Sequence, residues 1–138
     1  METKKINRYD LLRDVVPYYA VDLDGTLAEY HGWTESVTEI GNPIPSMVER
    51  VKIWIASGQQ VKIFTARVDG DDLEELNQIV CAIQLWCKKH IGVILPVTNV
   101  KTYAMIQLWD DRCVQVTTNT GIPVGDQQQV HELPKPKH

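Results

Sequence analysis

Hydrophobic positions along the 138-residue chain form short apolar runs that alternate with longer amphipathic segments. The apolar runs are rich in β-branched and aromatic residues and end at turn-forming residues, which is typical of buried strands. The amphipathic segments repeat apolar side chains three or four positions apart, as one face of a helix requires. The pattern predicts strands at residues 18–22, 61–64, 91–97 and 104–109, and helices at residues 43–57 and 71–90.

The order of these elements is strand, helix, strand, helix, strand, strand. This alternation predicts a mostly parallel sheet joined by right-handed crossovers. We therefore expect one α/β, Rossmann-like domain with helices on both faces of its sheet. The domain core is predicted at residues 18–120, between an N-terminal extension (1–17) and a polar, flexible C-terminal tail (121–138). Residues 7–16 read as a short helix, and Val114–Val116 as a short fifth strand.

Composition supports a single domain, because this length with 43% hydrophobic residues supplies one core. The net charge of −4 lacks the basic surface of proteins that coat nucleic acid, but leaves a nucleotide or polynucleotide end open as substrate. Three cysteines without a CxxC pair indicate free thiols rather than a disulfide or zinc site. No signal-peptide pattern or membrane-length apolar run occurs, so we expect a cytoplasmic protein with no membrane partner.

Each predicted strand is followed by polar residues that can bind a phosphate or a cation. In chain order these residues are Asp22, Asp24, Gly25 and Thr26, then Thr65 and Arg67, then Lys101, and finally Asp110 and Asp111. Chemistry in open parallel sheets gathers at the carboxyl ends of the strands, so we expect these side chains to converge.

Several carboxylates crowded together repel one another, and a hard divalent cation relieves that repulsion. Mg²⁺ suits such a site, because it binds a few carboxylate oxygens, keeps waters and accepts phosphate oxygens as further ligands. A threonine hydroxyl and a lysine add a donor and a positive charge for an anionic group. The residue set therefore predicts Mg²⁺-assisted phosphoryl transfer, in which an aspartate can serve as the nucleophile.

Four segments of the chain, "DLDGTL", "VKIFTAR", the lysine of "TNVK" and the acid pair of "LWDDR", resemble the four motifs of the haloacid dehalogenase (HAD) superfamily of phosphohydrolases. The resemblance covers residues 18–116. More narrowly, the chain is similar to small HAD-like proteins common in bacteria and phages, and to the phosphatase half of phage-type polynucleotide kinase-phosphatases. It implies a Mg²⁺-dependent phosphomonoester hydrolase.

The resemblance implies a catalytic set of four residues: Asp22, Asp24, Thr65 and Lys101. Asp22 would attack phosphorus and form an aspartyl-phosphate, while Asp24 would protonate the leaving oxygen and then deprotonate the hydrolytic water. Thr65 would hydrogen-bond the phosphoryl group, and Lys101 would neutralise its charge. Because Lys101 lies only a short distance before the acid pair in the chain, Lys62 and Arg67 stay open as alternatives.

For the metal, the resemblance implies ligation by Asp22, by the backbone carbonyl of Asp24 and by Asp110. It implies that Asp111 contacts waters of the metal, although the order of the two adjacent acids stays open. Gly25 would turn the backbone away from the strand.

For the phosphate, the resemblance implies contacts from the backbone N–H groups of Gly25 and Thr26. Arg67 has two open interpretations: it clamps a substrate phosphate in a bidentate fork, or it pairs with Asp69 or Glu75.

Members of the HAD superfamily often select substrates with an inserted cap domain. Here residues 25–42 leave room only for a flap, and residues 66–100 are used by one helix and one strand, so we expect no cap domain. An open site suits a large substrate, such as a polynucleotide 3′-phosphate or a phosphoprotein, or a small one covered by a partner copy in a homo-oligomer. The side chains of Tyr30, His31 and Trp33 either stack on a base or sugar or pack the loop. Trp54, Trp86 and Trp109 are assigned to the core.

Two other classes of protein deserve comparison. A response-regulator receiver also combines acids, a threonine and a lysine on a parallel sheet, but its acid pair is adjacent and its phosphoacceptor ends a later strand. A non-catalytic or regulatory phosphate- or metal-binding protein on the HAD fold is the remaining alternative. The presence of both Asp22 and Asp24 favours the enzyme.

Overall fold

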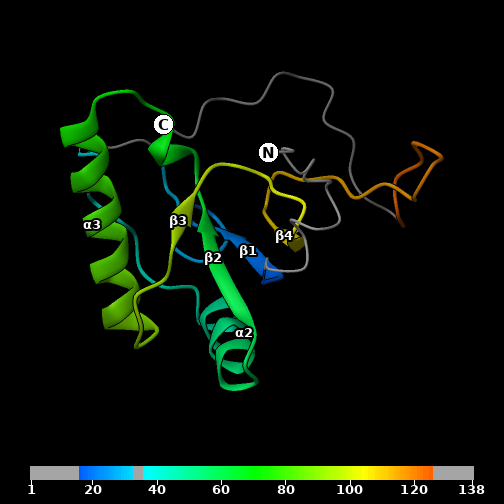
Figure 1. Ribbon diagram of the computed structural model, residues 1–138, viewed down its shortest axis with the longest axis horizontal. Coiled ribbons are helices and arrows are strands. Elements are labelled where there is room, and N and C mark those ends of the chain that lie inside the picture. Colours follow the sequence, from blue (N-terminus) through cyan, green and yellow to red (C-terminus); the bar gives the residue numbers. More distant parts are fainter. Residues whose placement is uncertain (1–15, 33–35, 126–138) are drawn as a thin grey trace, which may run out of the picture.

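A computed structural model of the chain describes residues 16–32 and 36–125 (Figure 1). The elements within these residues are β1 Tyr18–Asp22, α2 Pro45–Ala56, β2 Gln60–Phe64, the 3₁₀ helix η1 Ala66–Val68, α3 Leu73–His90, β3 Val97–Thr98 and β4 Met105–Trp109. The predicted α/β class is confirmed. The predicted helix at 7–16, Trp33 and most of the predicted C-terminal tail lie outside the described residues.

The four strands form an all-parallel sheet in the order β3-β2-β1-β4. Along one side of β1, Tyr18 pairs with Gln60 and Asp22 with Phe64. On the other side, Val21 pairs with Trp109 of β4. The chain thus steps from β1 to β3 in one direction and returns to place β4 beside β1. Ligands of open parallel sheets bind at the carboxyl ends of the strands where the order reverses in this way.

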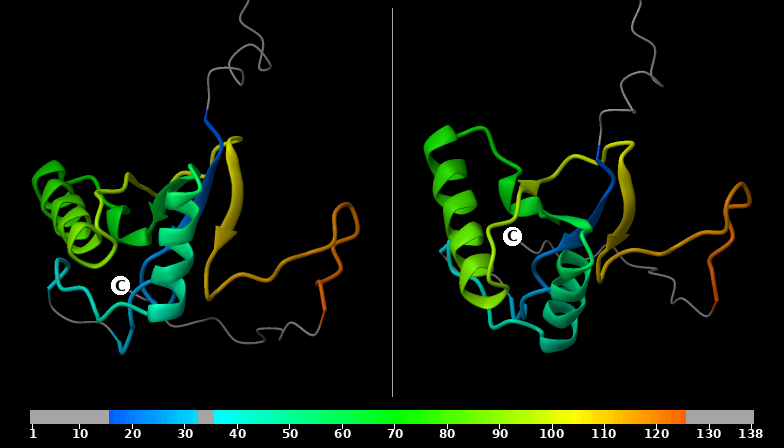
Figure 2. Two further views of the ribbon diagram at one scale, coloured as in Figure 1. Left: turned by 90° about the horizontal axis from the view of Figure 1, so that it is seen from below. Right: turned by 60° about the horizontal axis from the view of Figure 1, so that its bottom comes forward.

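Both helices pack against the same face of the sheet, as Figure 2 shows. One core cluster joins Val21 of β1 and Ile63 of β2 to Val51 of α2 and Ile83 of α3. The prediction of helices on both faces is therefore wrong for the described residues. Two successive right-handed crossovers in one direction put both helices on one side. The connection that returns from β3 to β4 contains no helix.

The third strand is much shorter than predicted, since β3 consists of Val97, the last residue of the apolar run 91–97, and the following Thr98. Helix α3 continues to His90, and Gly92 then adopts a φ of +103°, which turns the chain. Ile91 and Leu95 are nevertheless buried in the core. The hydrophobicity of this run thus indicates burial, and only its end forms a strand.

The predicted fifth strand at Val114–Val116 is also wrong, because Val116 forms only an isolated antiparallel bridge with Pro123. The amide of Val124 donates to the carbonyl of Gln115 at 2.8 Å, which closes a small hairpin that projects away from the sheet (Figures 1 and 2). The predicted boundary between core and tail at residue 120 falls inside this hairpin.

The tryptophans differ in burial, although all three were assigned to the core. Trp86 is buried, and its indole N–H donates to the carbonyl of Gly41 at 3.0 Å. Trp54 and Trp109 are only half-buried. Their rings meet edge to face at 5.4 Å, and the guanidinium of Arg50 lies 4.7 Å from the centre of the Trp109 ring. No helix within the described residues is long and apolar enough to span a membrane.

Candidate functional site

The turn after β1 positions the first acidic side chain. Asp22 ends the strand and is 7% exposed, and the amides of Leu27 and Ala28 then donate to the carbonyl of Leu23 at 3.0 and 2.9 Å. Gly25 has a φ of +89°, as the predicted turn away from the strand requires.

Gly25 is also in close contact with the end of β4. A Cβ atom added to Gly25 would lie only 2.5 Å from Oδ2 of Asp111. The positive φ therefore favours a glycine at this position, and any larger residue would also force the side chain of Asp111 to move.

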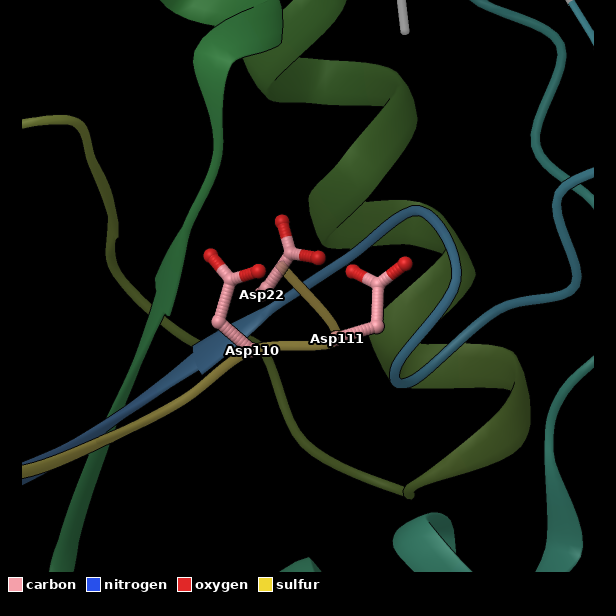
Figure 3. Close-up of side chains that lie close together, drawn as sticks. All are labelled: Asp22, Asp110 and Asp111. Carbon is pink, nitrogen blue, oxygen red and sulfur yellow. The ribbon is translucent and has the colours of Figure 1, made fainter. Parts of the chain in front are cut away.

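Three aspartates meet at the carboxyl ends of β1 and β4 (Figure 3). Asp22, Asp110 and Asp111 each offer one carboxylate oxygen, and these oxygens lie within 4.8 Å of one another. Asp22 is buried, Asp110 half-buried and Asp111 exposed. The neighbouring positions of β1 and β4 bring together acids that are far apart in the sequence. This donor set fits a hard cation such as Mg²⁺, which prefers carboxylate oxygens.

Thr26 links two of these aspartates. Its Oγ1 lies 3.2 Å from Oδ2 of Asp22 and 3.4 Å from Oδ1 of Asp111, and it accepts the amide of Asp111 at 3.1 Å. Its one hydroxyl proton serves one carboxylate at a time. The hydroxyl therefore contacts the acids themselves, whereas the sequence assigned this residue to the phosphate.

The amides of the turn are also engaged within the chain. The N–H of Gly25 donates to the carbonyl of Ala28 at 2.8 Å, and that of Thr26 to the carbonyl of Leu23 at 3.3 Å. The expectation that both amides face a phosphate is therefore not met in this structure.

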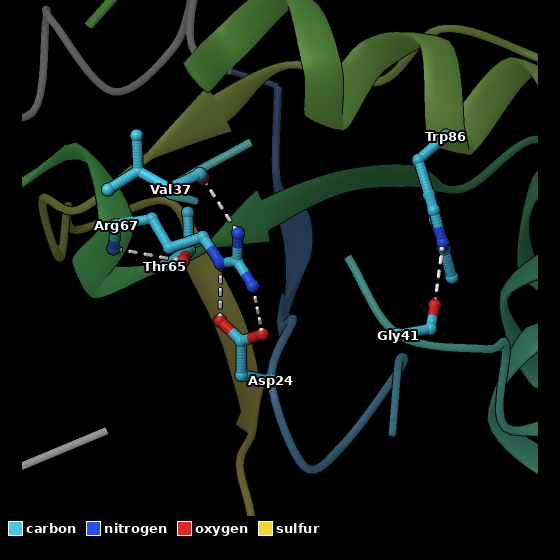
Figure 4. A network of polar contacts seen from close by, with 6 residues as sticks. All are labelled: Asp24, Val37, Gly41, Thr65, Arg67 and Trp86. Atoms are coloured by element: carbon cyan, nitrogen blue, oxygen red, sulfur yellow. Dashed lines mark hydrogen bonds and ion pairs between the residues drawn. The ribbon is translucent and has the colours of Figure 1, made fainter. Parts of the chain in front are cut away.

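Asp24 lies outside the acidic group and is bound by Arg67 (Figure 4). Nε of Arg67 donates to Oδ2 and Nη2 to Oδ1 of Asp24, both at 2.8 Å, which is a bidentate fork. Arg67 thus takes neither predicted partner, Asp69 nor Glu75. The contact follows from the strand order, because Arg67 comes just after β2, which lies beside β1 and so brings Arg67 close to the residues that follow Asp22.

Arg67 also contacts the loop after β1 and the residue that caps its own 3₁₀ helix. Its Nη1 donates to the carbonyl of Val37 at 2.8 Å, and its backbone N–H donates to Oγ1 of Thr65 at 3.1 Å. Thr65 is 1% exposed and caps the 3₁₀ helix that carries Arg67.

Val37 belongs to the loop 28–43, which connects β1 to α2. Ala28 and Pro43 form an antiparallel bridge at its base, where the amide of Glu29 donates to the carbonyl of Asn42 at 2.8 Å. A Cβ on Gly41 would collide with the carbonyl of Glu29. The described parts of this loop, residues 28–32 and 36–43, are therefore held together at the base, and no inserted domain lies within them.

The predicted lysine is not in contact with the acids. Lys101 is exposed in the connection between β3 and β4, and among the described residues it has no hydrogen-bond or ion-pair partner. The alternative, Lys62, lies over the ring of Tyr18 at 4.2 Å, on the sheet face away from the helices. Within residues 16–32 and 36–125, Arg67 is the cation that the structure pairs with a predicted catalytic acid.

Comparisons with known proteins identify no family for this chain. Neither the protein-family models nor the curated proteins that were searched include a match. A solved structure of a conserved protein from Bacteroides thetaiotaomicron is similar, with 23% sequence identity and a TM-score of 0.47, over 72% of this chain and 79% of that chain. The class that the fold itself defines is an α/β domain with a four-stranded parallel sheet.

Proposed function

We propose that this protein is a Mg²⁺-dependent phosphomonoester hydrolase of the HAD type that acts through an aspartyl-phosphate. The observation that carries this proposal is the group formed by Asp22, Asp110 and Asp111 at the carboxyl ends of two adjacent parallel strands. The support for this proposal is chemical: a cation relieves the repulsion among three converging carboxylates, and a phosphate ester supplies the further oxygen ligands that Mg²⁺ accepts.

In this proposal Asp22, Asp110 and Asp111 hold the metal ion. Mg²⁺, when bound, neutralises charge on these carboxylates and on the phosphate that approaches them. The backbone carbonyl of Asp24 is the further ligand expected from the motif. The hydroxyl of Thr26 contacts the carboxylates of both Asp22 and Asp111 and so helps to fix their relative positions.

The reaction has two steps. A carboxylate oxygen of Asp22 attacks phosphorus, and the bond to the leaving oxygen breaks as that oxygen takes its electron pair and a proton from Asp24. Water then attacks phosphorus, passes a proton to Asp24, and the bond to Asp22 breaks to release inorganic phosphate. Thr65 donates its hydroxyl proton to the phosphoryl group, and Lys101 adds positive charge from the connection between β3 and β4.

The substrate proposed here is a nucleotide or a polynucleotide 3′-phosphate. The small loop 28–43 supports an open site that admits a large substrate, since no inserted domain covers the acids in the described residues. A second copy of the chain, as in a homo-oligomer, is the other way to cover a small substrate at this edge.

A second candidate, a non-catalytic phosphate- or metal-binding protein, is compatible with one of the same observations. Asp24 is engaged by both arms of the Arg67 fork, an arrangement that a protein without proton transfer can also keep. The two candidates differ in turnover, because only the enzyme releases phosphate.

A phosphatase assay tests the proposal. We expect the wild-type protein with Mg²⁺ to hydrolyse p-nitrophenyl phosphate or a member of a panel of nucleotides, sugar phosphates and 3′-phosphorylated oligonucleotides. Asp22→Asn should abolish turnover because the amide cannot attack phosphorus, and chelation of the metal should do the same. Asp71→Asn is a matched control, since Asp71 is exposed and lies outside the acidic group.

Two results would contradict the enzyme reading. One is a wild-type protein that is inactive across the whole panel with Mg²⁺. The other is an Asp22→Asn variant, folded by circular dichroism, that keeps wild-type turnover.

A further inference from the structure

The ion pair between Asp24 and Arg67 is nearly buried, with side chains that are 6% and 10% exposed. The torsion that turns a carboxylate plane is broad in the absence of partners. Two parallel N–H···O bonds at 2.8 Å remove that freedom, because both oxygens must stay in the plane of the guanidinium. The fork occupies one lone-pair position on each oxygen of Asp24 and thereby sets the direction of the others.

The same guanidinium holds the loop 28–43. A third side-chain bond of Arg67, from Nη1 to the carbonyl of Val37, lies on the side away from the Asp24 fork (Figure 4). At its other end the loop is tied to α3 by the bond from Trp86 to Gly41. Displacement of the segment around Val37 therefore removes a bond from the residue that orients Asp24.

We propose that Arg67 is a positioning residue for the acid/base step, which fixes the orientation of Asp24 and couples it to the loop 28–43 through Val37. This inference rests on the proposed phosphatase function. Arg67 acts through Asp24 and makes no bond to phosphate in this role. A lysine at this position keeps the charge but cannot form the planar fork, so it restores little of the orientation.

The consequence depends on the leaving group. Cleavage of an alkyl phosphate requires protonation of a poor leaving oxygen by Asp24, whereas p-nitrophenolate departs with little need of that proton. Loss of Arg67 should therefore impair hydrolysis of alkyl phosphates more than hydrolysis of p-nitrophenyl phosphate. A residue that grips the phosphate, or that only maintains the fold, would affect both substrates alike.

The test measures kcat/KM of the full chain with Mg²⁺ on p-nitrophenyl phosphate and on an alkyl phosphate such as glycerol phosphate. The variants are Arg67→Gln, Arg67→Lys, Asp24→Asn and the double variant Arg67→Gln/Asp24→Asn. Arg50→Gln is the matched control, because it makes the same chemical change at the guanidinium that lies over Trp109.

We expect Arg67→Gln to lose at least about tenfold more activity on the alkyl ester than on the nitrophenyl ester. Adding it to Asp24→Asn should cost less than about threefold more, since coupled residues are not additive.

A second measurement does not depend on turnover. Amide hydrogen exchange of the peptide that contains residues 36–42 should be faster in Arg67→Gln than in the wild type and unchanged in Arg50→Gln. This result is expected because the bond to Val37 is lost only in the first variant.

The inference is overturned by equal losses on the two esters, by losses that add in full on the Asp24→Asn background, or by unchanged exchange around Val37. The first two outcomes presuppose an active wild-type protein, and the third can be observed with one, so they contradict this inference without contradicting the proposed function. A wild type that is inactive on both esters instead contradicts the proposed function, and this inference with it.

Discussion

At the carboxyl edge of the sheet, contacts within the protein constrain which residue types fit individual positions, in addition to the chemistry of the proposed reaction. The position of Gly25 favours glycine because its φ is positive, and a side chain there would displace the carboxylate of Asp111 that lies against it. Thr26 touches Asp22 and Asp111 with a single hydroxyl. Arg67 binds Asp24 with a geometry that a lysine cannot reproduce. The motif residues thus hold one another in place before any ligand is bound.

Replacement of Gly25 by alanine separates backbone strain from displacement of the acid. Gly58 is the matched control, since it has a φ of +83° but no atom within 4 Å of an added Cβ. Gly58→Ala should cost about 1 kcal/mol of unfolding free energy through strain alone. Gly25→Ala should cost more and also weaken Mg²⁺ binding, because Asp111 must move. Urea unfolding and calorimetric Mg²⁺ titration measure the two effects, and equal Mg²⁺ affinity in both variants would refute the expected displacement.

At the scale of the elements, local signals located both helices and the strands β1, β2 and β4 to within two residues, and they failed at the third strand. Helix α3 begins where an aspartate precedes an apolar stripe, and Asp72 is its N-cap. Its Oδ1 accepts the amides of Glu74 and Glu75 at 3.1 and 3.2 Å. Strands have no such signal at their ends, because a strand is defined by its neighbours. The run 91–97 is largely apolar, yet only its last residue and Thr98 pair with β2 as a strand, and the carbonyl of Pro96 accepts the amide of Ile63 just before them.

The N-cap of α3 has a measurable contribution to stability. Asp72→Ala should lower the unfolding free energy by about 1 kcal/mol, because two amides at the helix start lose their acceptor. Asp71→Ala, one residue earlier and without that role, should change it by less than about 0.5 kcal/mol. Urea denaturation with an unchanged m-value would report this difference. Equal stability of the two variants would show that the cap bonds do not stabilise α3.

At the scale of the whole molecule, the order of the strands determines both the core and the site. Both helices cover one face, and their apolar stripes meet the strands in a single cluster that includes Cys87. The return of β4 to the far side of β1 brings Asp110 and Asp111 to Asp22. A different order of the same strands would keep every motif and separate these carboxylates.

Burial of Cys87 links the core to the pH dependence of global stability. The side chain is fully buried, and desolvation raises the pKa of its thiol to about 11 from a usual value of 9.0. The unfolded chain therefore releases this proton at lower pH than the folded protein does. The contribution of the buried thiol to the unfolding free energy is fully present below about pH 9. As the pH rises towards 11, the unfolding free energy falls by about 2 to 3 kcal/mol. Cys87→Ala should show a shallower decline in urea unfolding over this range, and parallel pH profiles for the two proteins would argue against the raised pKa.

What the sequence determines by itself is what depends on neighbouring residues along the chain. The periodicity of apolar residues defined α2 and α3, the short apolar runs defined β1, β2 and β4, and residue type at the strand ends selected the acids. These signals are local, so they can be recognised in the sequence without knowledge of the fold.

Only the tertiary structure decided which of these residues touch. It put both helices on one face, shortened the third strand, paired Arg67 with Asp24 and left Lys101 exposed away from that pair. Asp24 and Arg67 are 43 positions apart, and no local pattern encodes their contact. Their bond exists because β1 and β2 are neighbours in register, and register is set by the packing of the whole sheet against its helices.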